Sequence, residues 1–307
     1  MKYFTPIFPF IIGCIVLILM PSLFELAIIN LLGQTLLFVI VACIPAYKTG
    51  RMSYVDIAWP WGLVLIGILT YFFSSGHWLR VSIISAIYLI IGLRMGLGAL
   101  KMWKIGWLNT ELPRYQYQRR RWQNSGKTNE SLIMQIEILI QGLANASFLA
   151  YPAFIIGINP QTSISVFEIV GIAIWLSAFV MESIADTQKL KFLKQMKING
   201  DKNKVCTIGL WSYTRHPNYF AEWMVWNALI IGSISSWFYY LPLQQNQFSL
   251  VLWILIGLGL IFVSRVMYAT LVYFTGAKPA EYYSIQKRPD YKKYQQSTNM
   301  FFPGPHK

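Results

Sequence analysis

The apolar runs of this chain constrain its fold more than any other feature. Several of them approach or exceed the roughly 20 residues that an α-helix needs to cross the hydrocarbon core of a bilayer. They predict about eight transmembrane helices, within a range of seven to ten, and therefore an all-α integral membrane bundle. The shortest run is open to a re-entrant or tilted placement. The predicted spans are Phe4–Met20, Leu26–Tyr47, Trp59–Phe73, Leu79–Leu100, Leu132–Ile158, Val166–Ala185, Tyr219–Leu241 and Leu250–Phe274.

The composition agrees with a membrane protein. Of 307 residues, 55% are hydrophobic and 12% are charged, which is roughly half the charged fraction of an average soluble domain. The chain has no tandem repeat, low-complexity linker, G-x-G-x-x-G loop or Walker loop. No small-residue cleavage site follows the first apolar run, so we expect a retained helix rather than a signal peptide. One integral membrane domain over residues 1–307 is the simplest interpretation.

The distribution of lysine and arginine predicts the topology. The connections Gly157–Ser165 and Pro242–Ser249 contain neither residue, whereas two other connections and the C-terminal segment are rich in both. The positive-inside rule therefore places the basic connections and both termini in the cytoplasm. The positive-inside rule then accounts for much of the net charge of +14. Nucleic-acid binding is therefore not expected. The basic connections contain Lys101, Lys104, Arg114, Arg119, Arg120, Arg121 and Lys127, and Lys189, Lys191, Lys194, Lys197, Lys202, Lys204 and Arg215.

The segment Gly209–Glu222, GLWSYTRHPNYFAE, concentrates polar groups between two apolar spans. Polar and ionisable side chains in or near a bilayer are costly and mark candidate functional sites. Pro217 suits the first turn of a helix, because the N–H that it lacks has no partner there anyway. Asn218 and Glu222 then share one helix face at a spacing of four residues. A helix N-terminus flanked by basic side chains favours the binding of an anion.

Two acids upstream of this segment also share a helix face. Glu182 and Asp186 lie four residues apart, one turn before Lys189. Two acids on one face repel each other, so we expect cations or ligand hydroxyl groups to approach them. The cations available for this role are Arg215, His216 and Arg265. For any single residue, a structural ion pair or an interfacial position stays open as the alternative.

The segment Glu281–Pro303 near the C-terminus mixes aromatic rings with lysine and arginine at short spacing. Rings can cover an adenine face, and cations can bind phosphates. The alternative is an interfacial segment that lies on anionic lipid.

Taken together, these motifs resemble the bacterial membrane branch of the steroid 5-alpha-reductase family, whose members carry a steroid 5-alpha-reductase C-terminal domain. The similarity covers about residues 55–303 and is most specific over residues 180–303. Three blocks match in order, and a weaker fourth match links an arginine to an E-x-x-R-Y segment. The blocks are Glu182–Gln188, Gly209–Glu222, and Lys287–Tyr291 with Tyr294, Thr298 and Pro303, and the fourth match is Arg94 with Glu111–Tyr115.

The resemblance implies a multi-pass protein of the bacterial cytoplasmic membrane that binds NADPH on its cytoplasmic side. It implies reduction of a carbon–carbon double bond conjugated to a carbonyl in a lipophilic, steroid- or isoprenoid-like substrate. Its other expected partner is membrane lipid, and the oligomeric state stays open. The cofactor-binding positions that carry over are Glu182, Asp186, Tyr213, Arg215, His216, Asn218 and Glu222, joined by Arg265, Lys287, Arg288, Tyr291 and Tyr294.

The resemblance leaves the catalytic acid open. Steroid-reducing members polarise the substrate carbonyl with a Glu–Tyr pair from the N-terminal half, and Ile91 stands three residues before Arg94, where the tyrosine is expected. Tyr88, Tyr115 and Glu137 are the residues available for this role. The three cysteines have no metal-ligand spacing, so no metal is expected.

Two other function classes stay open from the sequence. Membrane isoprenylcysteine and phospholipid methyltransferases share an R-H-P-x-Y-x-x-E run, which holds S-adenosylmethionine, and this chain reads RHPNYFAE. The upstream acidic face and the K-R-P-x-Y-x-x-Y segment favour the reductase. A non-enzymatic transporter or lipid-binding membrane protein would use the acids as an ion relay. Such a transporter is expected to contain paired broken helices, which the sequence does not indicate.

Overall fold

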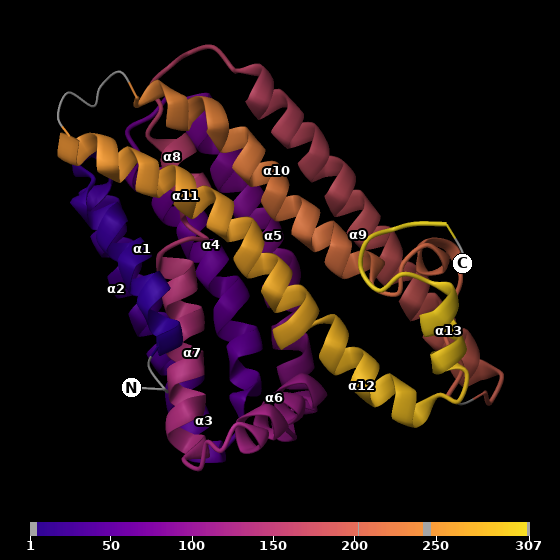
Figure 1. Cartoon of the computed structure of the whole chain (residues 1–307). Coiled ribbons are helices and arrows are strands. Elements are labelled where there is room, and N and C mark those ends of the chain that lie inside the picture. The colour runs from indigo at the N-terminus through magenta and orange to yellow at the C-terminus, as the bar shows by residue number, and fades with distance from the viewer. Residues whose placement is uncertain (1–4, 202, 242–246, 306–307) are drawn as a thin grey trace. The chain divides into compact units, whose positions relative to one another are not determined.

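The computed structural model describes residues 5–201, 203–241 and 247–305 (Figure 1). The described residues form helices and their connections, with no β-strand among them, which confirms the expected all-α class. They divide into two compact units. Unit 1 is Met1–Ile169 with Ile230–Val263, and unit 2 is Val170–Leu229 with Ser264–Lys307. This division does not test the expected single membrane domain, which stays a prediction.

The first part of the chain supplies most helices of unit 1. They are α1 (Phe8–Leu19), α2 (Phe24–Phe38), α3 (Ile44–Thr49), α4 (Val55–Phe73), α5 (Trp78–Lys104), α6 (Pro113–Asn124), α7 (Glu130–Ala146) and α8 (Tyr151–Gly157). Short 3-10 turns occur at η1 (Thr5–Ile7), η2 (Pro21–Leu23), η4 (Met52–Tyr54) and η5 (Trp107–Asn109), and a π-helical turn, η3 (Val39–Cys43), joins α2 to α3.

Unit 2 takes its helices from the later chain. The long helices are α9 (Val166–Ile198), α10 (Pro217–Tyr239) and α11 (Gln247–Ala269), and the unit boundaries fall within them. The remaining elements are η6 (Gly209–Ser212), the π-helical η7 (Thr270–Phe274), α12 (Ala277–Lys287) and α13 (Tyr291–Ser297).

Six helices of the described chain are long and apolar enough to cross a membrane, so a helical membrane bundle is confirmed. They are Pro21–Thr49, Met52–Phe73, Trp78–Lys104, Glu130–Gly157, Val166–Ile198 and Ser249–Lys287. The run that seemed shortest in the sequence begins earlier than expected and spans 22 residues as Met52–Phe73. Of the expected connection Pro242–Ser249, residues 242–246 lie outside the described residues.

The two other expected spans are also helical but are not among the six. The first is a shorter apolar helix, Thr5–Leu19. The second is α10, whose hydropathy is reduced by amides, serines and Glu222. Six of the eight expected spans therefore have the length and hydropathy of a membrane-spanning helix, and the count of eight stays a prediction.

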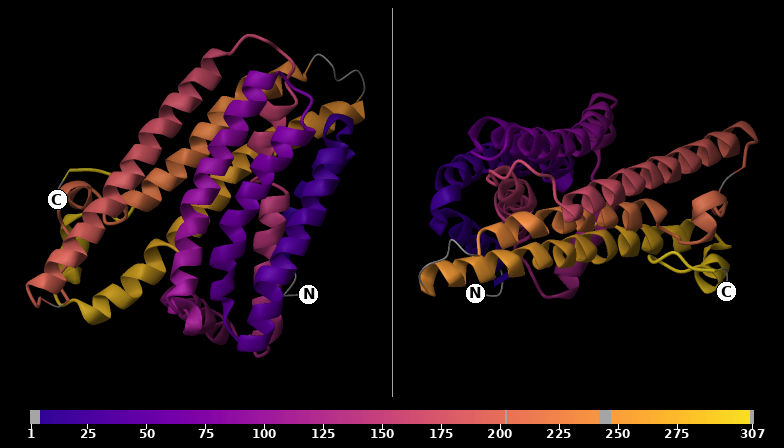
Figure 2. Two further views of the ribbon diagram at one scale, coloured as in Figure 1. Left: turned by 180° about the vertical axis from the view of Figure 1, so that it is seen from behind. Right: turned by 90° about the horizontal axis from the view of Figure 1, so that it is seen from above.

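A buried amide cluster joins α2, α4 and α7 inside unit 1, where α4 and α5 run side by side (Figure 2). Gln34 Nε2 donates to the Gly62 carbonyl at 2.8 Å, and Asn145 Nδ2 donates to the Trp59 carbonyl at 3.0 Å. Asn30 is also fully buried and donates to the carbonyls at the end of α7. A Cβ on Gly62 would stand 2.0 Å from Asn145 Nδ2, so only glycine permits this approach.

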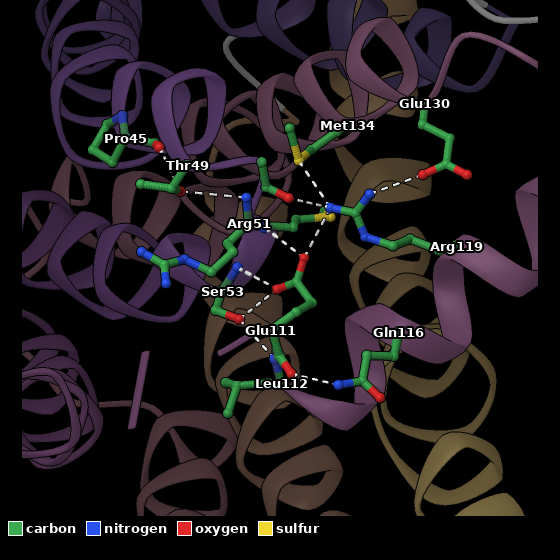
Figure 3. A network of polar contacts seen from close by, with 12 residues as sticks. Pro45, Thr49, Arg51, Ser53, Glu111, Leu112, Gln116, Arg119, Glu130 and Met134 are labelled. Atoms are coloured by element: carbon green, nitrogen blue, oxygen red, sulfur yellow. Dashed lines mark hydrogen bonds and ion pairs between the residues drawn. The ribbon is translucent and has the colours of Figure 1, made fainter. Parts of the chain in front are cut away.

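The E-x-x-R-Y segment fastens α6 to the neighbouring helix starts (Figure 3). The Glu111 carboxylate accepts the backbone N–H groups of Met52 at 2.9 Å and Ser53 at 3.1 Å, and so satisfies donors at the entry to α4. Arg119 binds Glu111 at 3.1 Å and Glu130 at 2.9 Å. The segment therefore has a structural role in this chain.

Candidate functional site

The polar segment predicted to matter most folds as a 3-10 turn followed by the start of α10. Helix α10 begins at Pro217, as the sequence predicts. Gly209 adopts a φ of +56°, and a Cβ at this position would stand 2.3 Å from Gln188 Nε2. The backbone N–H of Leu210 donates to Gln188 Oε1 at 2.9 Å, and Trp211 Nε1 donates to the Ala185 carbonyl at 3.0 Å. The turn is thus anchored on α9 at Ala185 and Gln188, on either side of Asp186 in sequence.

One of the predicted contacts between α9 and α10 is present. Asn218 Nδ2 donates to Asp186 Oδ1 at 3.2 Å. The Oδ1 atom of Asn218 is buried and has no hydrogen-bond partner among the described residues. Glu182, one turn earlier on α9, is buried as well, while Asp186 is half-buried. At the first turn of α10, an acid therefore accepts a hydrogen bond from the Asn218 amide, and the oxygen of that same amide is buried without a donor.

Lys189 follows Asp186 by one turn on α9. Its Nζ lies 4.4 Å from the centroid of the Trp211 ring, an arrangement that holds the ammonium over an aromatic face. Glu222, the second predicted residue on the α10 face, is half-buried. Lys189 therefore places one cation against the turn that carries Trp211.

Arg215 and His216 do not bind the acids of α9, which corrects the sequence expectation. Both bind Glu281 on α12 instead. Arg215 Nε lies 2.7 Å from Glu281 Oε1, and His216 Nε2 lies 3.1 Å from the same oxygen. Gln295 Nε2 donates to Glu281 Oε2 at 2.6 Å. In the sequence, Glu281 begins the aromatic and basic segment Glu281–Pro303, and no motif identifies it as the acid that binds these two side chains.

All three guanidinium nitrogens of Arg215 donate hydrogen bonds to protein acceptors. Its Nη1 donates to the carbonyls of Gln295 at 3.0 Å and of Thr298, and its backbone N–H donates to the Asn299 carbonyl at 2.9 Å. The residue is 8% exposed. Arg215 therefore fastens the C-terminal segment to the start of α10.

His216 is buried beside this ion pair. Its ring stacks on Tyr219 with a centroid separation of 5.3 Å and an interplanar angle of 6°. Burial lowers the pKa of His216 below its ordinary value of 6.5, although the hydrogen bond to Glu281 opposes the shift. The ring is thus neutral near pH 7 and donates Nε2–H to the carboxylate.

The C-terminal segment packs on the same turn through two buried tyrosines. Tyr294 OH donates to the Trp211 carbonyl, and Tyr291 contacts Tyr294 edge-on at 5.8 Å. Burial raises the pKa of both hydroxyls. Thr214 Oγ1 donates to the Phe301 carbonyl at 2.9 Å. Both tyrosines therefore lie against the turn of unit 2, and their predicted cofactor contact stays a prediction.

The other predicted cofactor contacts are more open. Arg265, Lys287 and Tyr213 are exposed. Arg288 is half-buried, with Nε donating to the Lys204 carbonyl at 3.1 Å and Nη1 donating to Ser284 Oγ at 3.0 Å. All twelve predicted cofactor residues belong to unit 2.

The three candidates for a catalytic acid belong to unit 1, and each has protein partners. Tyr88 OH donates to the Leu149 carbonyl at 2.6 Å. Tyr115 OH donates to Asp56 Oδ1 at 2.5 Å, and burial raises its pKa well above the ordinary value. Glu137 accepts Trp122 Nε1 at 2.6 Å and Gln118 Nε2 at 3.0 Å. In this state none of the three presents an uncommitted hydroxyl or carboxyl group.

Within the described residues there is no group of three or more His, Cys, Asp or Glu side chains that could hold a metal ion. No curated protein and no solved structure matches the chain. One family model does match it, over residues 37–298, and its description is "Protein of unknown function (DUF1295)". The match covers most of the 307 residues. The chain therefore belongs to the DUF1295 family.

Proposed function

We propose that this protein is a membrane-bound, NADPH-dependent reductase related to the steroid 5-alpha-reductases. The substrate class is a lipophilic molecule in which a carbon–carbon double bond is conjugated to a carbonyl. The sequence blocks Glu182–Gln188 and Gly209–Glu222 support this proposal, because their polar side chains come together at one turn of unit 2.

The observation that carries the proposal is the unfilled acceptor of Asn218. A buried amide oxygen without a donor is costly, at about 1–3 kcal/mol, and native proteins rarely keep one without a reason. Asn218 donates to Asp186, so its own Oδ1 is left for a donor from elsewhere. The carboxamide of a nicotinamide ring and the hydroxyls of a ribose are donors of this kind.

The surrounding residues fit such a cofactor. The carboxylates of Glu182 and Asp186 are acceptors for ribose hydroxyls, and Lys189 is a cation next to them. The phosphates of NADPH need further cations, and Arg215 is already bound to Glu281. We therefore assign phosphate binding to Lys189, Arg265, Lys287 and Arg288.

The protein would supply binding, orientation and exclusion of water. NADPH, when bound, supplies the hydride that reduces the double bond. Asp186 on α9 orients Asn218 through the amide N–H, and the Arg215–Glu281 pair holds the C-terminal segment against the start of α10, which carries Asn218. A lipophilic substrate would reach the site from the bilayer. In this proposal both termini and the cofactor site face the cytoplasm of a bacterial cell.

The runner-up is an S-adenosylmethionine-dependent methyltransferase, because the RHPNYFAE run suits that cofactor as well. The two proposals differ in ligand charge. Purified full-length protein in detergent should be stabilised against heat by NADPH, and less by NADH, which lacks the 2′-phosphate. Stabilisation by S-adenosylmethionine and not by NADPH would contradict the reductase proposal and support the methyltransferase.

A pair of asparagine variants on α10 tests the site itself. Asn218→Ala should weaken NADPH binding about five- to hundredfold and leave the melting temperature of the cofactor-free protein nearly unchanged. Asn227→Ala is the matched control, because Asn227 donates to the Trp223 carbonyl at 2.7 Å and accepts from Ser264 Oγ at 2.9 Å. That control should lower the melting temperature without changing NADPH affinity. If Asn218→Ala lowered the melting temperature and left NADPH affinity unchanged, Asn218 would not be a cofactor-binding residue.

A further inference from the structure

The end of α5 carries an exposed surface that the proposed function does not use. Helix α5 has 27 residues and is about 40 Å long, whereas the hydrocarbon core of a bilayer is about 30 Å thick. Its last turns therefore extend into the headgroup region. We refer to Lys101–Trp107 as the α5 basic end.

The α5 basic end combines cations with apolar rings. Lys101 and Lys104 are exposed. Between and after them, the exposed fractions are 51% for Trp103, 60% for Ile105 and 60% for Trp107. Tryptophan beside lysine is the pattern that proteins place at the membrane–water interface. Water alone would not favour three large apolar side chains on one exposed turn.

The charge at this end of unit 1 is only partly balanced by acids of the protein. The stretch from Lys101 to Lys127 contains seven lysines and arginines and one acid, Glu111. Glu111 is occupied by Arg119 and by backbone N–H groups (Figure 3). Arg114 is bound to Asp56 in the same unit. Lys101 and Lys104 form no ion pair with any residue that the structure describes.

We propose that the α5 basic end binds the headgroup phosphates of anionic phospholipids. Lysine ammonium groups are compact point charges that bind phosphate. Anionic lipid attracts basic segments next to a transmembrane helix. The flanking Trp103 and Trp107 rings select a lipid over a soluble phosphate, because they need an acyl–headgroup boundary to cover them. Arg120, which is also exposed on α6, adds to the positive potential.

The test compares two double variants of the full-length protein that lose the same charge. Lys101→Gln/Lys104→Gln removes the proposed ligands. Lys191→Gln/Lys194→Gln is the control, because these lysines have the same spacing and are exposed on α9. Each protein is placed in phosphatidylcholine nanodiscs with increasing phosphatidylglycerol, and quenching of tryptophan fluorescence by brominated phosphatidylglycerol is measured.

The first variant should need about tenfold more phosphatidylglycerol for half-maximal quenching, while the control stays close to the parent. Trp103→Phe/Trp107→Phe should remove the quenching component that depends on phosphatidylglycerol. Melting temperatures in pure phosphatidylcholine check that all variants fold. If Lys101→Gln/Lys104→Gln does not fold, the single variant Lys104→Gln takes its place.

Three results would overturn the proposal. Equal quenching by brominated phosphatidylcholine would mean that the surface does not select charge. An equal loss in the Lys191/Lys194 control would mean that the effect is not local. If millimolar inorganic phosphate displaced brominated phosphatidylglycerol from the detergent-solubilised protein, the lysines would bind a soluble anion. None of these results bears on NADPH binding, because no residue is shared with that site.

Discussion

Arg215 and Glu281 form a buried ion pair in which two guanidinium nitrogens face two carboxylate oxygens. Nε lies 2.7 Å from Oε1, and Nη2 lies 3.2 Å from Oε2. Each side chain is 9% exposed. The pair joins two segments of unit 2 that are separated by 66 positions in sequence. It decides how the C-terminal segment meets the start of α10.

Replacing Glu281 should therefore destabilise unit 2. Glu281→Ala leaves the Arg215 guanidinium buried without an acid, and removal of one partner from a buried pair typically costs about 3–5 kcal/mol. Unfolding followed by heat or by denaturing detergent should shift accordingly. Asp290→Ala is the control, because the Asp290–Lys293 pair is 3.7 Å long and both side chains are mostly exposed. Equal stability of the two variants would contradict a structural role for the pair.

The stability of the protein should fall as the pH is lowered through the ordinary pKa of histidine. Burial lowers the pKa of folded His216 below 6.5. Between the folded and the unfolded pKa, the unfolded state binds more protons, so the contribution of His216 is complete above pH 6.5 and decreases below it. Once the pH is below the folded pKa, no further loss comes from this group.

The measurement for His216 is the free energy of unfolding between pH 5 and pH 8. The parent protein should lose more stability than His216→Asn on acidification, because the variant lacks the proton-binding group. Parallel pH profiles would show that His216 does not cause the loss.

Two glycines of unit 1 should respond to alanine with opposite signs. Gly62→Ala places a methyl group against the buried amides of Gln34 and Asn145, and overpacking of this kind costs about 1–3 kcal/mol. Gly98→Ala meets nothing within 4 Å on an exposed face of α5. Alanine should stabilise that helix by up to about 1 kcal/mol. Melting temperatures that rise for both variants would rule out the tight approach at Gly62.

The topology is testable with single cysteines on exposed connections. Thr162 lies in the connection without lysine or arginine, and Asn199 follows the basic end of α9. In cells that express a chain without its native cysteines, an impermeant thiol reagent should label Thr162→Cys and leave Asn199→Cys unmodified. Labelling of Asn199→Cys alone would show that the orientation in the membrane is opposite to the proposed one.

Local features of the site could be predicted from the sequence because they depend on spacing along one helix. Pro217 begins α10 as its missing N–H suggests. Glu182 and Asp186 share a face of α9, and Asp186 reaches Asn218. The helical class followed from the long apolar runs, while α10 is more polar than a full span because Asn218, Glu222 and Asn227 lie on it.

Long-range partners could not be predicted in the same way. The choice of Glu281 over Asp186 as the acid for Arg215 depends on how α12 packs, and no spacing rule gives a contact across 66 positions. The same holds for Tyr115, whose hydroxyl is bound by Asp56 across 59 positions. A signal was nonetheless present, because Glu281 was the only acid in the first eight residues of its segment.

The separation between Arg215 and Glu281 also sets an order for biosynthesis. Translation at about 5–20 residues per second delivers Glu281 roughly 3–13 s after Arg215. During that interval the guanidinium has no acid from α12 and no carbonyls from the C-terminal segment, so it must stay hydrated. The buried environment of Arg215 can therefore form only after α12 and α13 have been synthesised.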